Sequence, residues 1–492
     1  MDHPEGVVAP GPAGRDRFAF SAWLFLRLLA LIHLIAFASF WRQYPGLVGP
    51  HGLLPAQLYF DAVREHLGSG GWLQLPSLCW FFGANGFLPV LCAAGVVGSL
   101  LLFAGIAPAP CLVFLWAGYL SLMGAGQVFY GYQWDALLLE TTLLAVFVAP
   151  WSLTPLWGRT EPPRAARWLL WWLLFRLMFL SGAVKLTSGD ALWRNLTALA
   201  VHYETQPLPT PLAWFAHQLP LWVHRVSCAI MFLIELVVPF LLPAPRTLRH
   251  AAALLIAGFM VLIFLTGNYT FFNLLTVALC GLCLDDAWWA RVLRRSPAPA
   301  SSMRVAPRWL IVPSAALIFS FTLVQGAARL TSGAGIPTFY WSAERVIEPF
   351  RTLNSYGLFA VMTTPRPELI IEGSTDGREW LPYELPHKPG NLARRPDFVA
   401  PGQPRLDWQL WFAALETPEQ NPWVLSLSDH LLHGTPEVLA LFATNPFPDQ
   451  PPRFIRVIRY EYHFTTRVER ARNGHWWTRT PLDYYIEPAS LR

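Results

Sequence analysis

Charged residues are scarce between about residue 18 and residue 325 and become common again beyond that point. Over the whole chain of 492 residues only 14% are Asp, Glu, Lys or Arg, whereas soluble domains usually contain about a quarter. Long stretches without charge suit a lipid bilayer and are unusual on surfaces that face water. We therefore predict a polytopic membrane domain followed by a water-soluble domain.

Apolar runs within the charge-poor region predict a bundle of eight or nine transmembrane helices. A span needs about 20 residues, and several of the nine candidates are near the short limit. The candidates are Phe18–Phe40, Phe87–Ile106, Cys111–Gly126, Trp134–Val148, Trp168–Val184, Cys228–Leu242, Ala251–Leu265, Tyr269–Leu284 and Trp309–Gln325. The expected domains are a cytoplasmic tail at 1–17, a transmembrane domain at 18–329 and a soluble domain at 330–492.

Arginines predict the orientation of the bundle. If the N-terminus is cytoplasmic, the inside segments hold many more arginines, such as Arg164, Arg167, Arg246 and Arg249, than the outside loops. Cytoplasmic loops are enriched in positive charge, which favours this arrangement. With nine spans the C-terminal domain then faces the lumen or the periplasm. Residues Pro55–Leu67, in the first long outside loop, are expected to form a helix in the membrane interface.

The C-terminal domain is expected to be β-rich and sandwich-like, with helical insertions. Asp376-Gly377 separates two short apolar segments, as in a hairpin whose turn needs a left-handed residue. Alternating patterns predict further strands at Arg405–Leu415 and Phe454–Thr466, and Pro422–Leu432 and Pro436–Ala443 are expected to be short helices.

Five ionisable residues of the membrane domain form the predicted polar cluster: Asp135, Glu140, Arg176, Lys185 and Glu235. Charges in a bilayer are costly, so they tend to be paired or functional. Asp135 begins its span and suits the helix dipole, whereas Glu140 lies deeper and needs a partner such as Arg176 or Lys185. Lys185 is one of only two lysines in the chain. Because lysine loses its proton readily when desolvated, Lys185 is a candidate catalytic base, with ion pairing as the alternative.

The second long outside loop, residues 186–225, contains His202, Glu204 and His217. Their spacing is too irregular to predict a metal site. The sequence also lacks the H-E-x-x-H, G-x-S-x-G, P-loop and dinucleotide-binding motifs, so no cofactor is expected. A net charge of +5 is modest for this length and does not indicate a nucleic-acid partner.

Several polar and aromatic strings resemble the lipase maturation factor family. They are Gln133–Glu140, Phe179–Leu186, Leu196–Leu199, Tyr203–Trp214, Gly267–Thr276 and Glu348–Phe359. The resemblance implies a protein of the endoplasmic-reticulum membrane that helps secreted lipases to fold and assemble, and whose C-terminal domain is needed for this. It implies no catalytic residues. With such a client, five tryptophans of the C-terminal domain become candidates for contact with it: Trp380, Trp408, Trp411, Trp476 and Trp477.

A shorter string, Ser181–Lys185 followed by Trp193, is similar to the span of the vitamin K-dependent carboxylase that carries its lysine base. This second resemblance implies a membrane enzyme in which Lys185 acts as general base on a lipid- or quinone-like ligand.

The main hypothesis is therefore an integral membrane protein that assists a secreted, lipase-like client without chemistry of its own. The alternative is the Lys185 enzyme, and a bound lipid is a further expected partner. The expected location is the endoplasmic-reticulum membrane in a eukaryote and the inner membrane in a bacterium.

Overall fold

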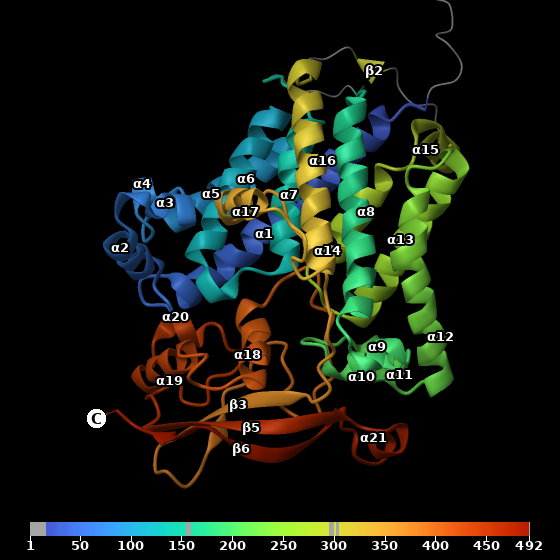
Figure 1. Ribbon diagram of the computed structural model, residues 1–492. Coiled ribbons are helices and arrows are strands. Elements are labelled where there is room, and N and C mark those ends of the chain that lie inside the picture. The colour runs from blue at the N-terminus through green and yellow to red at the C-terminus, as the bar shows by residue number, and fades with distance from the viewer. Residues whose placement is uncertain (1–15, 154–158, 295–299, 302–304, 492) are drawn as a thin grey trace, which may run out of the picture.

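The computed structural model describes residues 16–153, 159–294, 300–301 and 305–491. Long helices form a bundle, and a smaller region with a β-sheet is attached to one end of it (Figure 1). Most of the predicted tail, residues 1–15, lies outside the described residues. The two-part architecture predicted from charge distribution is confirmed.

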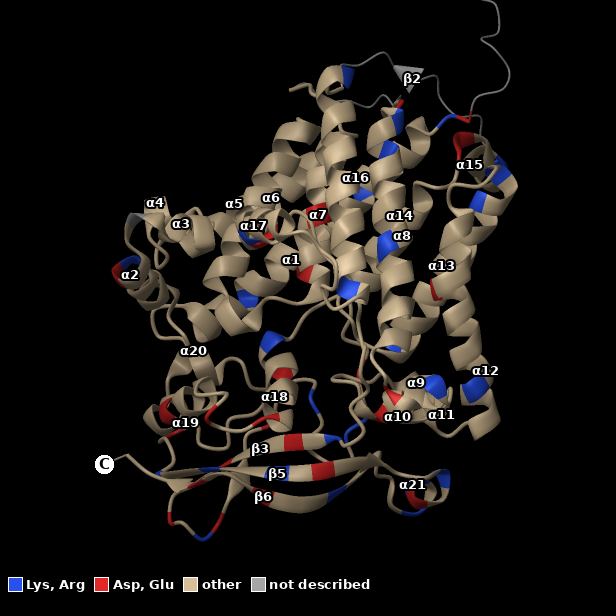
Figure 2. Ribbon diagram, viewed as in Figure 1, with Lys and Arg blue, Asp and Glu red and all other residues tan. Residues whose placement is uncertain are grey.

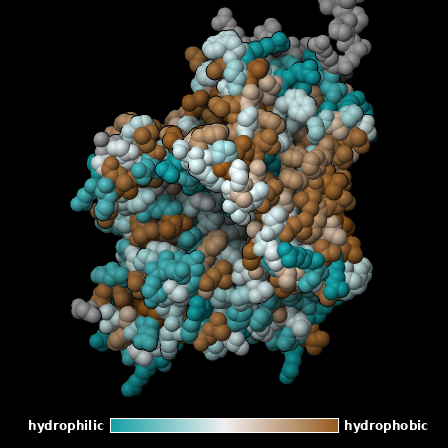
Figure 3. All heavy atoms as spheres, viewed as in Figure 1, coloured by the Kyte–Doolittle hydropathy of each residue, from teal (hydrophilic) through white to brown (hydrophobic). Residues whose placement is uncertain are grey.

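Seven helices of the described residues are long and apolar enough to cross a membrane. They are α1 (Ala19–Val48), α5 (Phe87–Ala104), α6 (Pro108–Ala125), α8 (Arg164–Thr187), the segment Leu221–Leu241, α13 (Arg246–Thr266) and α16 (Arg308–Leu330). The segment Leu221–Leu241 consists of α12 (Leu221–Phe232), a π-helical turn η3 (Leu233–Val237) and a 3₁₀ turn η4 (Val238–Leu241). Apolar side chains gather along the outer face of α12 and α13, as expected for contact with lipid (Figure 3).

Two shorter helices complete the bundle. They are α7 (Gln133–Val146) and α14 (Phe272–Gly281), so each of the nine predicted spans coincides with a helical segment. Helix α7 packs between α6 and α8, and α14 packs against α1 and α13. Most residues of both helices are buried. Because protein surrounds them, neither has to present a full bilayer-length apolar surface to lipid.

The two ends of α1 show that the N-terminal end and the C-terminal region lie on opposite sides of the bundle. At its start, the carboxylate of Asp286 accepts the amides of Ala19 (3.2 Å) and Phe20 (2.9 Å), which satisfies N–H groups that have no partner within the helix. At its other end, Gln43 donates to the carbonyl of Gln403 at 2.7 Å. The chain therefore crosses the bundle an odd number of times, as nine spans require.

Most positions along the helices of the bundle are uncharged, and charged residues are more frequent near the ends of the bundle and in the C-terminal region (Figure 2). At the N-terminal end, the guanidinium groups of Arg167 and Arg249 lie 3.8 Å and 5.3 Å from the ring of Phe18. These are two of the arginines predicted to be inside. We call the end of the bundle that begins α1, where these arginines lie, the arginine-rich end.

Short helices connect the spans of the described residues. On the side of the C-terminal region they are α2 (Ala56–Leu67), η1 (Gly68–Gly70), α3 (Gly71–Gln74), α4 (Cys79–Phe82), η2 (Gln127–Phe129), α9 (Ala191–Arg194), α10 (Ala198–Thr205) and α11 (Pro211–His217). The others are α15 (Asp286–Leu293) and the paired two-residue strands β1 (Arg159–Thr160) and β2 (Ala300–Ser301), while α17 (Thr338–Ile347) and η5 (Glu348–Phe350) lead from the last span to the sheet. The helix predicted at Pro55–Leu67 is confirmed as α2.

The C-terminal region contains one antiparallel sheet with the strand order β4-β3-β5-β6. The strands are β3 (Pro367–Ser374), β4 (Leu381–Pro382), β5 (Phe454–Phe464) and β6 (Trp477–Ala489). The predicted hairpin is β3–β4, and Gly377 in its turn has φ +74°, which glycine adopts without strain. The predicted strand at Phe454–Thr466 is confirmed as β5.

Helices cover the sheet where a sandwich would have a second sheet. Helix α18 (Arg405–Leu415) packs on β3, and α19 (Trp423–His433) packs on β5. The predicted strand at Arg405–Leu415 is therefore wrong, because Leu406, Leu410 and Ala413 lie on one helical face. The short helices predicted after Pro422 and Pro436 are confirmed as α19 and α20 (Pro436–Leu439), and α21 (Arg467–Asn473) joins β5 to β6.

Candidate functional site: buried ion pairs between the bundle and the C-terminal region

Glu140 and Arg176 form an ion pair in the middle of the bundle. The Arg176 guanidinium on α8 donates to one carboxylate oxygen of Glu140 on α7, and the two side chains are 3% and 0% exposed. The other oxygen of Glu140 accepts the amide of Asn354 at 3.1 Å and the hydroxyl of Tyr356 at 2.7 Å. Arg176 also donates to the carbonyl of Asn354 at 2.8 Å. Of the two partners predicted for Glu140, Arg176 and Lys185, the structure has Arg176. The pair also binds the segment that leads to the sheet.

Asp135, at the start of α7, binds Arg405 of the C-terminal region. Their closest nitrogen and oxygen atoms are 3.5 Å apart, and both side chains are buried. The hydroxyl of Tyr119 donates to the same carboxylate oxygen. The Arg405 guanidinium lies 3.4 Å from the centre of the Tyr130 ring and donates to the carbonyl of Phe129 at 2.6 Å. The helix dipole was the explanation predicted from the sequence for Asp135. In the structure Asp135 also has a counter-charge, Arg405, which is remote in sequence.

Lys185 and Glu235 form a third buried pair. The ammonium nitrogen lies 2.8 Å and 2.7 Å from the two carboxylate oxygens, and the Trp193 ring centre lies 5.3 Å away. Glu235 is placed by the π-helical turn η3, which packs closely against α8 at Gly182. A Cβ atom on Gly182 would lie 2.9 Å from the Cβ of Glu235, so only glycine permits this approach. The arrangement is a tightly packed ion pair.

The second lysine of the chain is also paired. Lys388 contacts the carboxylate of Glu368 on β3, which in turn accepts from Arg366 at 2.8 Å, and all three side chains are buried. Arg366 donates further to the backbone carbonyls of Glu204 (2.5 Å), Gln206 and Pro207 (3.1 Å). One guanidinium therefore attaches the α10–α11 connection to the sheet. This cluster was not predicted from the sequence, and the one signal that could have indicated it is that Lys388 is one of only two lysines.

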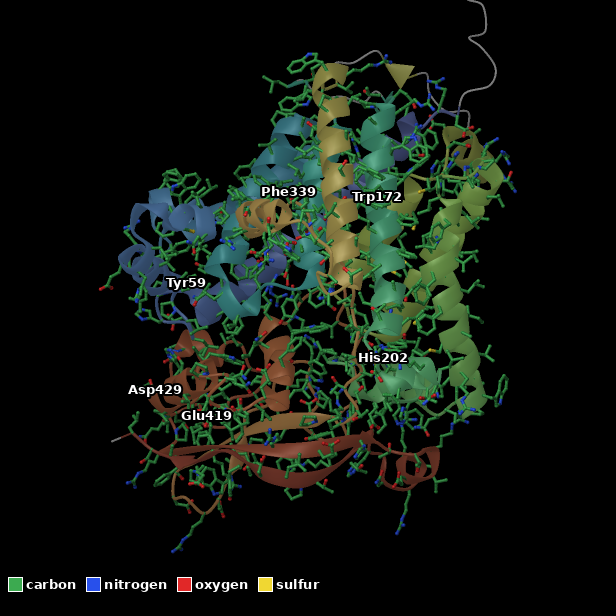
Figure 4. All side chains as sticks on the ribbon, in the orientation of Figure 1. Tyr59, Trp172, His202, Phe339, Glu419 and Asp429 are labelled. Carbon is green, nitrogen blue, oxygen red and sulfur yellow. The ribbon has the colours of Figure 1, made fainter. Side chains whose placement is uncertain are left out.

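Glu204 and His217 come together, whereas His202 does not join them. The Glu204 carboxylate lies 3.6 Å from the His217 ring, accepts the amide of Phe464 at 2.7 Å and contacts His463 at 2.9 Å. His202 lies at the lower end of the bundle, where its Nε2 is 3.2 Å from the Tyr269 hydroxyl (Figure 4). Among the described residues, no group of three or more His, Cys, Asp or Glu side chains is arranged so that it could hold a metal ion.

Acid is expected to weaken the structure through His202. Burial, and to a smaller extent the charge of Lys185, lower the pKa of His202 from 6.5 to about 4. Below pH 6.5 His202 is protonated in the unfolded chain but stays neutral in the folded protein. The free energy of unfolding therefore falls with decreasing pH until the pH reaches about 4. Between pH 7 and pH 5 the free energy of unfolding should fall by about 1–2 kcal/mol. This range includes a reduction for solvent screening, because His202 is only half-buried. Unfolding midpoints at both pH values check this.

His202→Gln is the control for this prediction, because the amide can still contact Tyr269 but does not titrate. It should reduce the difference between the two midpoints. An unchanged difference would assign the acid sensitivity to other groups.

The tryptophans proposed to face a partner protein mostly belong to the core instead. Trp408, Trp411, Trp476 and Trp477 are all buried, which corrects the expectation for these four. Trp408 lies 4.9 Å from Trp134 of the bundle, between ring centres. Trp380 is half-buried beneath Arg456, whose guanidinium lies 4.2 Å from the ring centre. Large aromatic side chains bury much apolar area, so they join the two parts of the molecule.

Two family descriptions and a set of curated proteins match this chain. Residues 20–291 match the lipase maturation factor transmembrane domain, and residues 352–487 match the lipase maturation factor C-terminal domain. Lipase maturation factor 2 of Homo sapiens is 37% identical, covering 95% of this chain and 82% of the relative. Lipase maturation factor 1 of Mus musculus is 34% identical, covering 98% of this chain and 89% of the relative. No solved structure matches the chain.

Proposed function

Because the chain belongs to the lipase maturation factor family, we propose that it assists the folding, assembly or export of secreted lipases. The observation that carries the proposal is that similarity to these relatives runs through both the bundle and the C-terminal region. The buried ion pairs that join the two parts support it further. They hold the C-terminal region as a fixed platform rather than as a tethered module.

The proposal includes a location and a division of labour. The protein is a multi-pass membrane protein, and its arginine-rich end, with the tail at 1–17, faces the cytoplasm. Residues 18–329 form the membrane domain. Within residues 330–492, Asn354 and Tyr356 still contact Glu140 inside the bundle, and the sheet region that follows them faces the compartment where a secreted lipase folds. That compartment is the endoplasmic reticulum in a eukaryote and the periplasm in a bacterium. The experiment below also tests which secreted lipase depends on this protein.

The test is complementation in cells that lack their own lipase maturation factor. A secreted lipase is produced with or without this protein, and both its secreted mass and its activity are measured. The proposal requires more active lipase per unit of lipase mass when the protein is present. The proposal would be refuted if, for several unrelated secreted lipases, the specific activity were the same with and without this protein, provided that its expression is confirmed.

Lys185 variants in the same assay separate an ion pair from a catalytic base. Lys185→Arg keeps the charge opposite Glu235, but a guanidinium does not serve as a general base. If Lys185 only forms an ion pair, lipase activity should stay within about twofold of wild type. Lys185→Met leaves Glu235 buried without a counter-charge and should cost about 3–5 kcal/mol of stability. Quantitative blotting of folded protein checks the second variant. Inactive but fully folded Lys185→Arg would support base chemistry on a lipid- or quinone-like ligand.

A further inference from the structure

The segment α2–α4, residues 56–82, carries an exposed apolar surface outside the bundle. The side chains of Phe81, Phe82 and Leu58 are 78%, 66% and 66% exposed, and those of Trp72 and Leu73 are 50% and 46% exposed. In Figure 1 these helices lie at the edge of the bundle, beside α5. Such a concentration of exposed aromatic and aliphatic side chains is costly in water and marks a contact surface.

The position of α4 relates this surface to the bilayer. The amide of Leu78 donates to the hydroxyl of Ser121 at 2.8 Å, and Ser121 lies in the last turns of α6. The ring of Phe82 stacks on Phe87, the first residue of α5, with ring centres 4.8 Å apart. The exposed face of α5 continues from there with Val90 and Val97. The apolar surface of α4 is therefore continuous with a lipid-facing helix, at the level where that helix begins.

A pocket of about 600 Å³ opens within this segment. It is lined by Arg64, Gly68, Trp72, Trp80 and Phe81. Arg64 is exposed, and its guanidinium lies 5.5 Å from the Trp80 ring centre. On α2 the polar residues Asp61, Arg64 and Glu65 share the exposed face, while Phe60 is buried. Arg64 lies beside the aromatic side chains of the pocket, on a helix whose outer face is polar. This combination is typical of segments that lie in the membrane interface.

We propose that the α2–α4 segment is immersed in the leaflet on the side of the C-terminal region. In this arrangement the pocket holds one phospholipid. Arg64 binds its phosphodiester, and Trp72, Trp80 and Phe81 contact the first methylenes of its acyl chains. Guanidinium groups bind phosphate by charge-assisted hydrogen bonds, and tryptophan favours the boundary between headgroups and hydrocarbon. The proposal does not depend on the proposed function, since it concerns bilayer lipid and not a lipase.

Spin labels at three positions test the immersion. The six native cysteines are all buried, so introduced cysteines can be labelled selectively. Phe82→Cys reports the segment, Leu317→Cys on α16 (71% exposed) reports lipid, and Val468→Cys on α21 (77% exposed) reports water. In phosphatidylcholine nanodiscs, the ratio of oxygen to nickel-complex accessibility at 82 should be roughly fivefold above that at 468. If the ratio at 82 equalled that at 468, the segment would lie in water and the proposal would be overturned. The exposed apolar surface would then be a contact site for a protein partner.

A lipid titration in detergent tests the pocket. A label at Leu73→Cys, next to the pocket but outside its lining, should become immobilised when dioleoylphosphatidylcholine is added. Arg64→Gln should raise the lipid concentration needed by about tenfold, because a charge-assisted contact is lost. Dioleoylglycerol has the same acyl chains without phosphate and should bind both proteins equally weakly. Equal response of the wild type to both lipids would refute phosphate recognition by Arg64.

Discussion

Glu140→Gln is expected to reduce the free energy of unfolding by about 3–5 kcal/mol, the usual cost of leaving one member of a buried pair without its counter-charge. The variant leaves the Arg176 guanidinium facing a neutral amide in the middle of the bundle. It also weakens the bonds that Glu140 receives from Asn354 and Tyr356. The unfolding midpoint in detergent, followed by tryptophan fluorescence, measures the effect.

Two further variants make this result specific. Glu379→Gln makes the same chemical change at an exposed position and should alter stability by less than about 0.5 kcal/mol. Glu140→Gln combined with Arg176→Gln removes both charges, so its loss should be smaller than the sum of the two single losses. If Glu140→Gln were as stable as Glu379→Gln, the central pair would not stabilise the bundle.

Arg366→Lys is expected to detach the α10–α11 connection from the sheet, although the charge is kept. Lysine has a single nitrogen and cannot span the three backbone carbonyls and the Glu368 carboxylate that the guanidinium reaches. Losing contacts to a charged donor should cost about 3 kcal/mol. Limited proteolysis should cleave near Pro207 sooner, and lipase activity should fall in the complementation assay.

Arg378→Lys, at an exposed position of the hairpin turn, is the matched control and should leave cleavage unchanged. Identical cleavage of both variants would show that Arg366 acts by its charge alone. The fork of hydrogen bonds would then have no separate role in joining the bundle to the sheet.

The spans were predictable because the bilayer imposes a length and a composition that any sequence must show. The pairing of Glu140 with Arg176 was predictable for a related reason, since a charge at that depth needs a partner from a neighbouring helix. The close approach at Gly182 and the π-helical turn that places Glu235 carry no such signal. They depend on packing between helices that single-sequence patterns do not reveal.

Contacts of the C-terminal region were the least predictable. The pattern of Arg405–Leu415 alternates like a strand, yet Leu406 and Leu410 face the sheet from a helix, because tertiary packing overrides a short alternating pattern. Arg405 and Arg366 also resembled ordinary surface charges of a soluble domain. Apart from Glu368, two residues beyond Arg366, their partners are remote in sequence: Asp135 and the carbonyls at the end of α10. Little in the neighbouring sequence therefore indicated that the two arginines are buried.

The remoteness of these partners has a consequence for biosynthesis. Glu140 is inserted into the membrane long before Asn354, which follows it by 214 residues, leaves the ribosome. Asp135 waits longer still for Arg405. Until the last third of the polypeptide is translated, the nascent bundle holds two carboxylates that lack part of their final set of partners. Shortened products of this chain should therefore be recognised as immature and degraded, instead of accumulating as a free-standing membrane half.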